Sequence, residues 1–148
     1  MFDILHRVGV KATTSDVYRA LTTRQGLAGW WTTDTRGSCD LGGVIEFHFG
    51  TRGHIKMKVL ELDPAARTVW QVVEGPEDWI GSRISFDLKQ EGEQATVLFK
   101  HQGWKEQSEF MHHCSTKWAT FMMSMKAFVE TGKGASFPND VHISVNWD

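Results

Sequence analysis

The chain contains seven histidines and two cysteines, the residue types most able to hold a metal or move a proton. His112, His113 and Cys114 are adjacent, but consecutive helical residues point about 100° apart, so the three cannot converge on one ion. Neither histidine has a His, Cys, Asp or Glu three or four residues later. We therefore expect no metal site, and no motif in the sequence indicates a cofactor.

His6 and His101 differ from the other histidines because each interrupts an apolar alternation, in residues 2–8 and 97–101 respectively. An imidazole in an apolar pocket can orient a ligand hydroxyl or carbonyl, or move a proton, since its unperturbed pKa is near 6.5. The alternative is a core histidine bonded to a backbone carbonyl or a turn. The sequence leaves both interpretations open.

Nucleophilic and nucleotide chemistry have little support. Cys39 stands in a polar segment without a recognisable partner, and Cys114 falls among apolar residues of a helical pattern. No G-x-S-x-G motif occurs, and the glycines at 37, 42 and 43 do not have the spacing of a phosphate-binding loop. We expect no covalent catalysis.

The elements that would position these residues follow from hydropathy patterns. Period-two alternation predicts a first strand over residues 2–10, and Thr14 or Ser15 can cap a helix that ends near Gly26, followed by a short turn over 27–31. Turn residues such as Asp63-Pro64 then separate five apolar runs. These predict an antiparallel meander with strands near 43–49, 54–62, 67–74, 81–90 and 94–101, six strands in all.

The longest helical pattern runs from Ser108 to the stop at Gly132. Its apolar residues fall within an arc of about 120°, which predicts one stripe facing the sheet. They are Phe110, Met111, Cys114, Trp118, Phe121, Met122, Met125, Phe128 and Val129.

The last residues form a separate feature. Val141, Ile143, Val145 and Trp147 alternate with polar residues, which predicts a seventh strand in a tail of residues 134–148 after a domain of residues 1–133. An unpaired apolar edge is an aggregation hazard, so such a strand must pair with its own sheet or with a partner. This pattern suggests a homodimer formed through the tail.

Short segments spaced along most of the chain carry a resemblance to a known family. They are residues 17–22 (VYRALT), Trp30-Trp31, Gly42-Gly43, residues 62–64 (LDP), Val69-Trp70, residues 101–103 (HQG), Trp118 and residues 130–132 (ETG). With them the chain resembles the heat-shock-protein ATPase activator homologue-like family of the START-like, birch-pollen-allergen-like (SRPBCC) superfamily. Thr13 and Lys117 depart from the family's usual proline and glycine.

The resemblance implies an α+β helix-grip fold, in which a curved antiparallel sheet of about six strands wraps around a long C-terminal helix, with two short helices after the first strand. It also implies a cavity for an apolar or amphipathic molecule between the sheet and that helix. The best-known members stimulate a chaperone ATPase with the help of an additional domain, which this short chain is not expected to contain, so we do not transfer that activity.

We therefore expect the chain to bind a small hydrophobic molecule without covalent chemistry. The alternatives are a cyclase, dehydratase or hydrolase that uses a cavity histidine, and a module that contacts a chaperone or another copy of itself. His6 and His101 would fix the ligand's polar group. The apolar walls would come from Phe47, Trp70, Phe86, Phe99, Trp118, Met122 and Met125, while Trp30, Trp31, Trp79 and Trp104 either border the cavity mouth or plug the ends of the core.

Composition restricts the partners. Sixteen basic residues against 18 acidic ones give a formal charge of −2 over 148 residues, with no basic surplus to meet a phosphate backbone, so nucleic acid is not expected. No apolar run approaches the roughly 20 residues of a membrane span, and the polar N-terminus does not resemble a signal peptide. These features favour a cytoplasmic protein with free thiols.

Overall fold

A computed structural model describes residues 1–146 of the chain, which form a single antiparallel sheet and three helices. In chain order the elements are β1 (Phe2–Val10), α1 (Thr14–Thr22), α2 (Arg24–Trp30), β2 (Asp34–Gly37), β3 (Val44–His48), β4 (His54–Asp63), β5 (Arg67–Glu74), β6 (Arg83–Glu91), β7 (Gln94–Trp104) and α3 (Glu109–Thr131). The 3-10 turns η1 (Gly50–Arg52) and η2 (Glu77–Trp79) interrupt the β3–β4 and β5–β6 connections.

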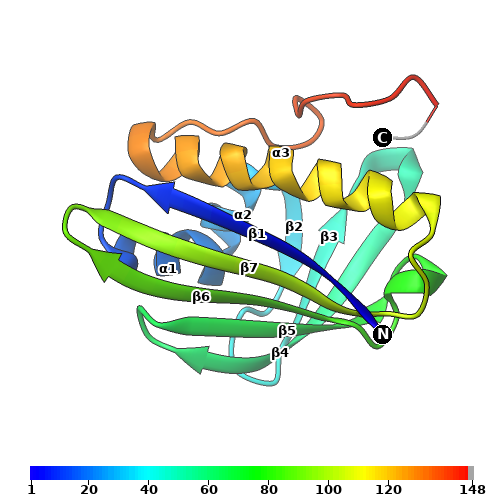
Figure 1. Cartoon of the computed structure of the whole chain (residues 1–148), viewed down its shortest axis with the longest axis horizontal. Helices are drawn as coiled ribbons and strands as arrows, with labels where there is room; N and C mark the ends of the chain where they lie inside the picture. The colour runs from blue at the N-terminus through cyan, green and yellow to red at the C-terminus, as the bar shows by residue number, and fades with distance from the viewer. Residues whose placement is uncertain (147–148) are drawn as a thin grey trace.

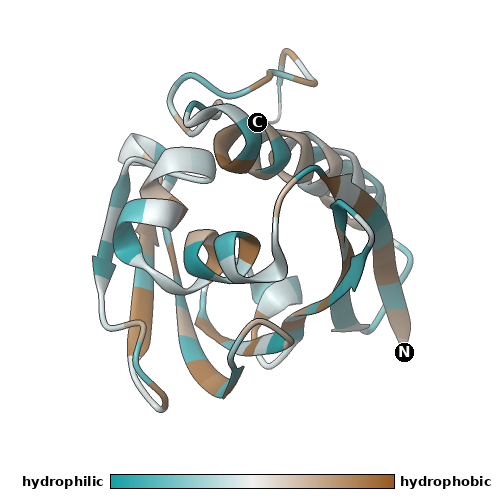
Figure 2. Ribbon diagram, turned by 90° about the vertical axis from the view of Figure 1, so that its left-hand side faces the viewer, coloured by the Kyte–Doolittle hydropathy of each residue, from teal (hydrophilic) through white to brown (hydrophobic). Residues whose placement is uncertain are grey.

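The sheet curves around α3, as the helix-grip prediction requires. Its strand order is β1-β7-β6-β5-β4-β3-β2, and every neighbouring pair is antiparallel. Figures 1 and 2 show the curved sheet with α3 lying across its concave side and α1 and α2 packed at one end. The predicted α+β helix-grip fold is confirmed.

The sheet has seven strands because a short polar strand joins its edge. The sequence predicts the other six to within about three residues at each end, but assigns no structure to Asp34–Gly37, which pairs with His48–Ile45 of β3. An edge strand pairs through its backbone, and the side chains of β2 lie at the surface or only half-buried. Apolar alternation therefore gives no signal for it.

The two short helices that the resemblance implies are present as α1 and α2, but the first ends at Thr22 and not near Gly26. The helix breaks at Thr23, whose extended backbone (φ −126°, ψ 147°) separates α1 from α2 and whose hydroxyl accepts a hydrogen bond from the Gly26 amide at 3.0 Å. The N-cap of α1 is Thr13, not Thr14 or Ser15, because the Thr13 hydroxyl accepts from the Asp16 amide. Both boundaries are set by side-chain caps, which the hydropathy pattern does not report.

The predicted stripe of α3 packs on the concave face of the sheet. Ser108 caps the helix by accepting from the Met111 amide, and Gly132 ends it in the left-handed conformation (φ 85°). The six central residues of the stripe are buried, and its three flanking residues are half-buried. Ser124 is buried beside them because its hydroxyl donates to the Trp30 carbonyl at 2.8 Å.

The tail is not a strand over residues 141–146, and Trp147 lies outside the described residues. It turns back along α3 (orange to red in Figure 1), and the Phe137 amide donates to the Trp31 carbonyl at 2.7 Å. The Phe137 carbonyl in turn accepts from the Thr33 amide at 3.1 Å, and the Ala135 amide donates to Ser124 Oγ at 2.8 Å. The predicted seventh strand is wrong because the tail finds its backbone partners within its own chain.

Within residues 1–146, no helix combines the length and apolarity that crossing a membrane requires.

Candidate functional site

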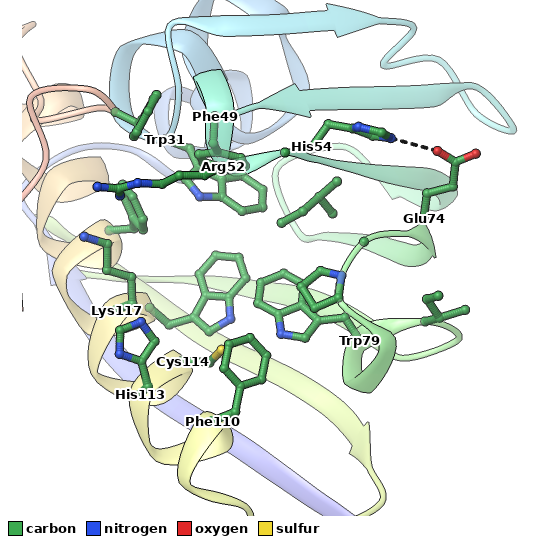
Figure 3. A pocket seen from close by; sticks show the side chains of 18 of the residues that line it. Trp31, Phe49, Arg52, His54, Glu74, Trp79, Phe110, His113, Cys114 and Lys117 are labelled. Carbon is green, nitrogen blue, oxygen red and sulfur yellow. Dashed lines mark hydrogen bonds and ion pairs between the residues drawn. The ribbon is translucent and has the colours of Figure 1, made fainter. Parts of the chain in front are cut away.

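A pocket of about 790 Å³ opens beside the N-terminal half of α3, in the size range of small-molecule sites. The β3–β4 and β5–β6 connections, α3 and the tail all contribute to its wall (Figure 3). Its lining residues are Trp31, Phe49, Arg52, Gly53, His54, Ile55, Val73, Glu74, Gly75, Pro76, Trp79, Ile80, Phe110, His113, Cys114, Lys117, Trp118, Phe121, Phe137 and Asp140.

Three indole rings form a continuous aromatic surface in this pocket. The ring centroids of Trp31 and Trp118 are 5.0 Å apart, and Trp118 stacks with Trp79 at 5.7 Å and an interplanar angle of 19°. All three side chains are buried, so their positions are fixed by packing. Such a surface suits a flat apolar molecule, because aromatic rings favour offset-stacked or edge-to-face neighbours.

The tail closes one side of the pocket with an aromatic ring and a carboxylate. The Phe137 ring lies 5.5 Å from that of Phe49, and the guanidinium of Arg52 lies 5.6 Å from its centroid. Asp140 Oδ2 forms an ion pair with Lys117 Nζ at 2.6 Å, and the same ammonium donates to the Val141 carbonyl at 2.6 Å. The tail is therefore attached to α3 at the pocket wall.

The rim between β4 and β5 is polar. His54 Nε2 lies 2.9 Å from Glu74 Oε2, and Lys56 Nζ lies 3.5 Å from the same oxygen (Figure 3 shows the first pair). The hydrogen bond from His54, followed by the charge of Lys56, lowers the pKa of the Glu74 carboxyl. This rim is solvated, so its ion pairs contribute little to stability.

Cys114 lines the pocket as an uncharged thiol. Burial raises its pKa to about 12, although the nearby indole N–H of Trp79 opposes the rise. Cysteine nucleophiles act as thiolates, so a thiol with this pKa is unreactive at neutral pH. The raised pKa of the buried thiol therefore gives no support for covalent chemistry at this position.

His101 is a fully hydrogen-bonded core residue and does not line the pocket. Its Nδ1 accepts from Trp118 Nε1 at 3.2 Å, so Nε2 carries the proton and donates to Ser82 Oγ at 2.8 Å. Ser82 in turn donates to the Trp79 carbonyl. The side chain is completely buried, and desolvation lowers the pKa of His101 to about 3, so the imidazole stays neutral.

His6 is also used structurally. It is half-buried on β1, its Nε2 lies 3.0 Å from the Ser115 carbonyl of α3, and its ring is 6.0 Å from that of Phe99. This contact attaches the edge strand β1 to the helix. His6 is not part of the pocket lining.

Nine residues are predicted to contact a ligand, and one of these nine, Trp118, lines the pocket. Phe47, Trp70, Phe86, Phe99, Met122 and Met125 are buried in the core, where neighbouring rings pack at 4.7 to 5.9 Å. The ligand role of these six and of the two histidines stays a prediction. Trp31 and Trp79 border the pocket, as one interpretation of the connecting segments allows, whereas Trp30 and Trp104 pack inside the core.

The pocket residues that sequence reasoning missed come from α3, β4 and β5 as well as from turns and the tail. Phe137 and Asp140 lie outside any regular pattern, so hydropathy gives no signal for them, whereas Phe49 lies in the run predicted as a strand over 43–49. Over residues 1–146, no three His, Cys, Asp or Glu side chains are grouped so that they could hold a metal ion.

The family described as "Activator of Hsp90 ATPase homolog 1-like protein" matches residues 11–130. The chain belongs to this family. The solution structure of the Aha1 dimer from Colwellia psychrerythraea is 43% identical, with a TM-score of 0.83, and the match covers 90% of this chain and 100% of that one. Because this identity is high, the Aha1-like architecture is shared in sequence as well as in fold.

More distant structures show the fold alone. Protein SSP2350 from Staphylococcus saprophyticus is 12% identical (TM-score 0.75, covering 90% of this chain and 95% of that one). Protein MLL2253 from Mesorhizobium loti is 14% identical (TM-score 0.76, covering 86% and 96%). A comparison with curated proteins gives no match.

Proposed function

We propose that this Aha1-like chain binds a small hydrophobic or amphipathic molecule in the pocket beside α3. The observation that carries the proposal is a cavity of about 790 Å³ whose surface is mainly apolar and includes several aromatic rings, with a few polar groups at its rim and at the tail. Small-molecule sites have this composition, because apolar walls supply affinity and a small number of polar groups fix orientation.

The environments of His101 and Cys114 favour binding over catalysis. Both ring nitrogens of His101 are occupied by protein partners, and Cys114 is held as a thiol. General acid–base chemistry needs a titratable group within hydrogen-bond reach of the substrate. The enzyme alternative based on His101 therefore has no support from the geometry.

Titration with N-phenyl-1-naphthylamine, an uncharged dye whose own fluorescence rises in an apolar site, tests the proposal. Val73 lines the pocket and is 40% exposed, while Val44 is a strand valine that is 38% exposed outside the lining. We expect Val73→Asp to weaken binding by about tenfold, because it places a charge on the apolar wall, and Val44→Asp to leave it unchanged. Equal affinity in both variants would remove the pocket as the binding site.

We also propose that the chain self-associates, since its 43% identical relative is described as a dimer. The tail carries exposed apolar side chains such as Val141, although it forms no strand there. We expect a dimer by sedimentation, converted toward monomer by Val141→Asp (54% exposed) but not by Leu41→Asp (66% exposed). If the intact chain is a monomer, the proposal of self-association is wrong. If the Val141→Asp variant is still a dimer, the chain does not self-associate through the tail.

A further inference from the structure

Asp140 is a buried carboxylate at the pocket wall whose hydrogen bonds are incomplete. Its side chain is 2% exposed, and although Oδ2 is ion-paired with Lys117, Oδ1 accepts no hydrogen bond from any of residues 1–146. Oxygens of ionised carboxylates accept more than one hydrogen bond each, and leaving one buried without a donor is costly. Buried polar atoms in folded proteins are generally satisfied by protein, water or a ligand.

The tail brings this carboxylate to the pocket. The family match ends at residue 130, so Asp140 and Phe137 belong to a segment beyond it, while Lys117 belongs to α3 inside it. The hydrogen bonds of Ala135 and Phe137 and the ion pair with Lys117 hold the segment in place. The chemistry at this side of the pocket therefore depends on residues that the family pattern does not specify.

We propose that Asp140 selects ligands that present an O–H or N–H donor, so that the preferred ligand is a flat aromatic molecule bearing a hydroxyl or amino group. This inference rests on the proposed binding function of the same pocket. The indole surface of Trp31, Trp79 and Trp118 accepts the aromatic body, and Asp140 Oδ1 accepts the donor. A ligand carboxylate is disfavoured beside Asp140, because two like charges repel strongly where water is excluded.

Naphthalene and 2-naphthol test the inference, since they share a ring system and differ by one hydroxyl. We expect the wild-type chain to bind 2-naphthol about tenfold more tightly in equilibrium dialysis at pH 7, because hydrogen bonds to charged groups are among the stronger ones. If naphthalene and 2-naphthol bind with equal affinity, Asp140 does not select a donor, while the proposed function survives. If neither binds, the proposed function itself fails.

A double variant assigns the preference to Asp140. Lys117→Met with Asp140→Leu removes both members of the ion pair, so no buried charge is left without a partner. We expect this double variant to bind 2-naphthol and naphthalene with about equal affinity. A general loosening of the pocket would instead weaken the binding of both probes alike and leave the ratio of their affinities unchanged. Lys126→Met with Glu130→Leu removes another ion pair of α3, at 2.8 Å, and should keep the preference. A preference that persists without Asp140 would overturn the inference.

Discussion

The hydrogen-bond network around His101 predicts a specific pH dependence of stability. The pKa of His101 is lowered to about 3 in the folded chain, whereas a solvated histidine in the unfolded chain titrates near 6.5. Between these values the unfolded state binds a proton that the folded state excludes. The contribution of the neutral imidazole to stability is therefore fully present above pH 6.5 and is lost as the pH falls toward 3.

The size of the effect follows from the two pKa values. The full difference of roughly 3.5 pKa units corresponds to about 5 kcal/mol, and between pH 7 and pH 5 the loss of unfolding free energy due to His101 is about 2 kcal/mol. The cause is burial: the ring is completely inaccessible to solvent, and its two nitrogens are bonded to Trp118 and Ser82. A protonated ring could not accept the indole N–H of Trp118.

Urea unfolding of the wild type and His101→Gln at pH 7 and pH 5 measures this contribution. We expect His101→Gln to be less stable at pH 7 by about 1–3 kcal/mol, because the amide reproduces the two hydrogen bonds imperfectly. Between pH 7 and pH 5, the unfolding free energy of His101→Gln should fall by about 2 kcal/mol less than that of the wild type. His112→Gln, which removes an exposed imidazole, serves as the control and should keep the wild-type loss.

The wild type and His101→Gln would lose the same free energy between pH 7 and pH 5 if His101 were protonated equally in the folded and unfolded states. That result would refute the assignment of a neutral, hydrogen-bonded imidazole. It would also reopen the interpretation of His101 as a proton-transfer group.

Three further predictions concern local packing. Ser124→Ala should raise amide hydrogen exchange at residues 135–137, because the Ser124 hydroxyl accepts from the Ala135 amide and donates to the Trp30 carbonyl; unchanged exchange there would contradict this anchor. Gly26→Ala should cost about 1–3 kcal/mol in urea unfolding, since a Cβ would lie 2.6 Å from the Ala20 backbone, and a neutral effect would show that α1 and α2 can separate freely. Ser108→Ala should cost about 1 kcal/mol by loss of the α3 cap, and a wild-type midpoint would mean that the cap is dispensable.

The sheet and α3 were predictable because each has one buried face along a regular element. Alternation with period two marks strands such as β4 and β5, and the apolar arc of residues 110–129 marks the helix. These signals arise from burial, which the sequence reports directly. The strand β2 and the division between α1 and α2 depend instead on backbone pairing and on the Thr23 cap, which hydropathy does not report.

The tail shows why an alternating pattern alone does not make a strand. Residues 141–145 alternate as strand residues do, but a strand also needs an edge with free backbone groups. The β1 edge lies against α3 through His6 and Ser115, and the tail residue Phe137 pairs with Trp31 and Thr33 near β2. The backbone of the tail is thereby held within its own domain before the alternating residues begin.

The resemblance to the family predicts that a pocket exists, but the sequence does not predict where it lies. Its position depends on which part of the space between the sheet and α3 the side chains leave unfilled. Between the sheet and the middle of α3, aromatic residues with a predicted ligand role, such as Phe86 and Phe99, are buried and meet at 5.4 Å. The pocket lies at the N-terminal half of α3, where turns and the tail complete walls that α3, β4 and β5 also form. Residues in such segments obey no periodicity, so the ligand preference attributed to Asp140 depends on tertiary packing that a sequence pattern does not encode.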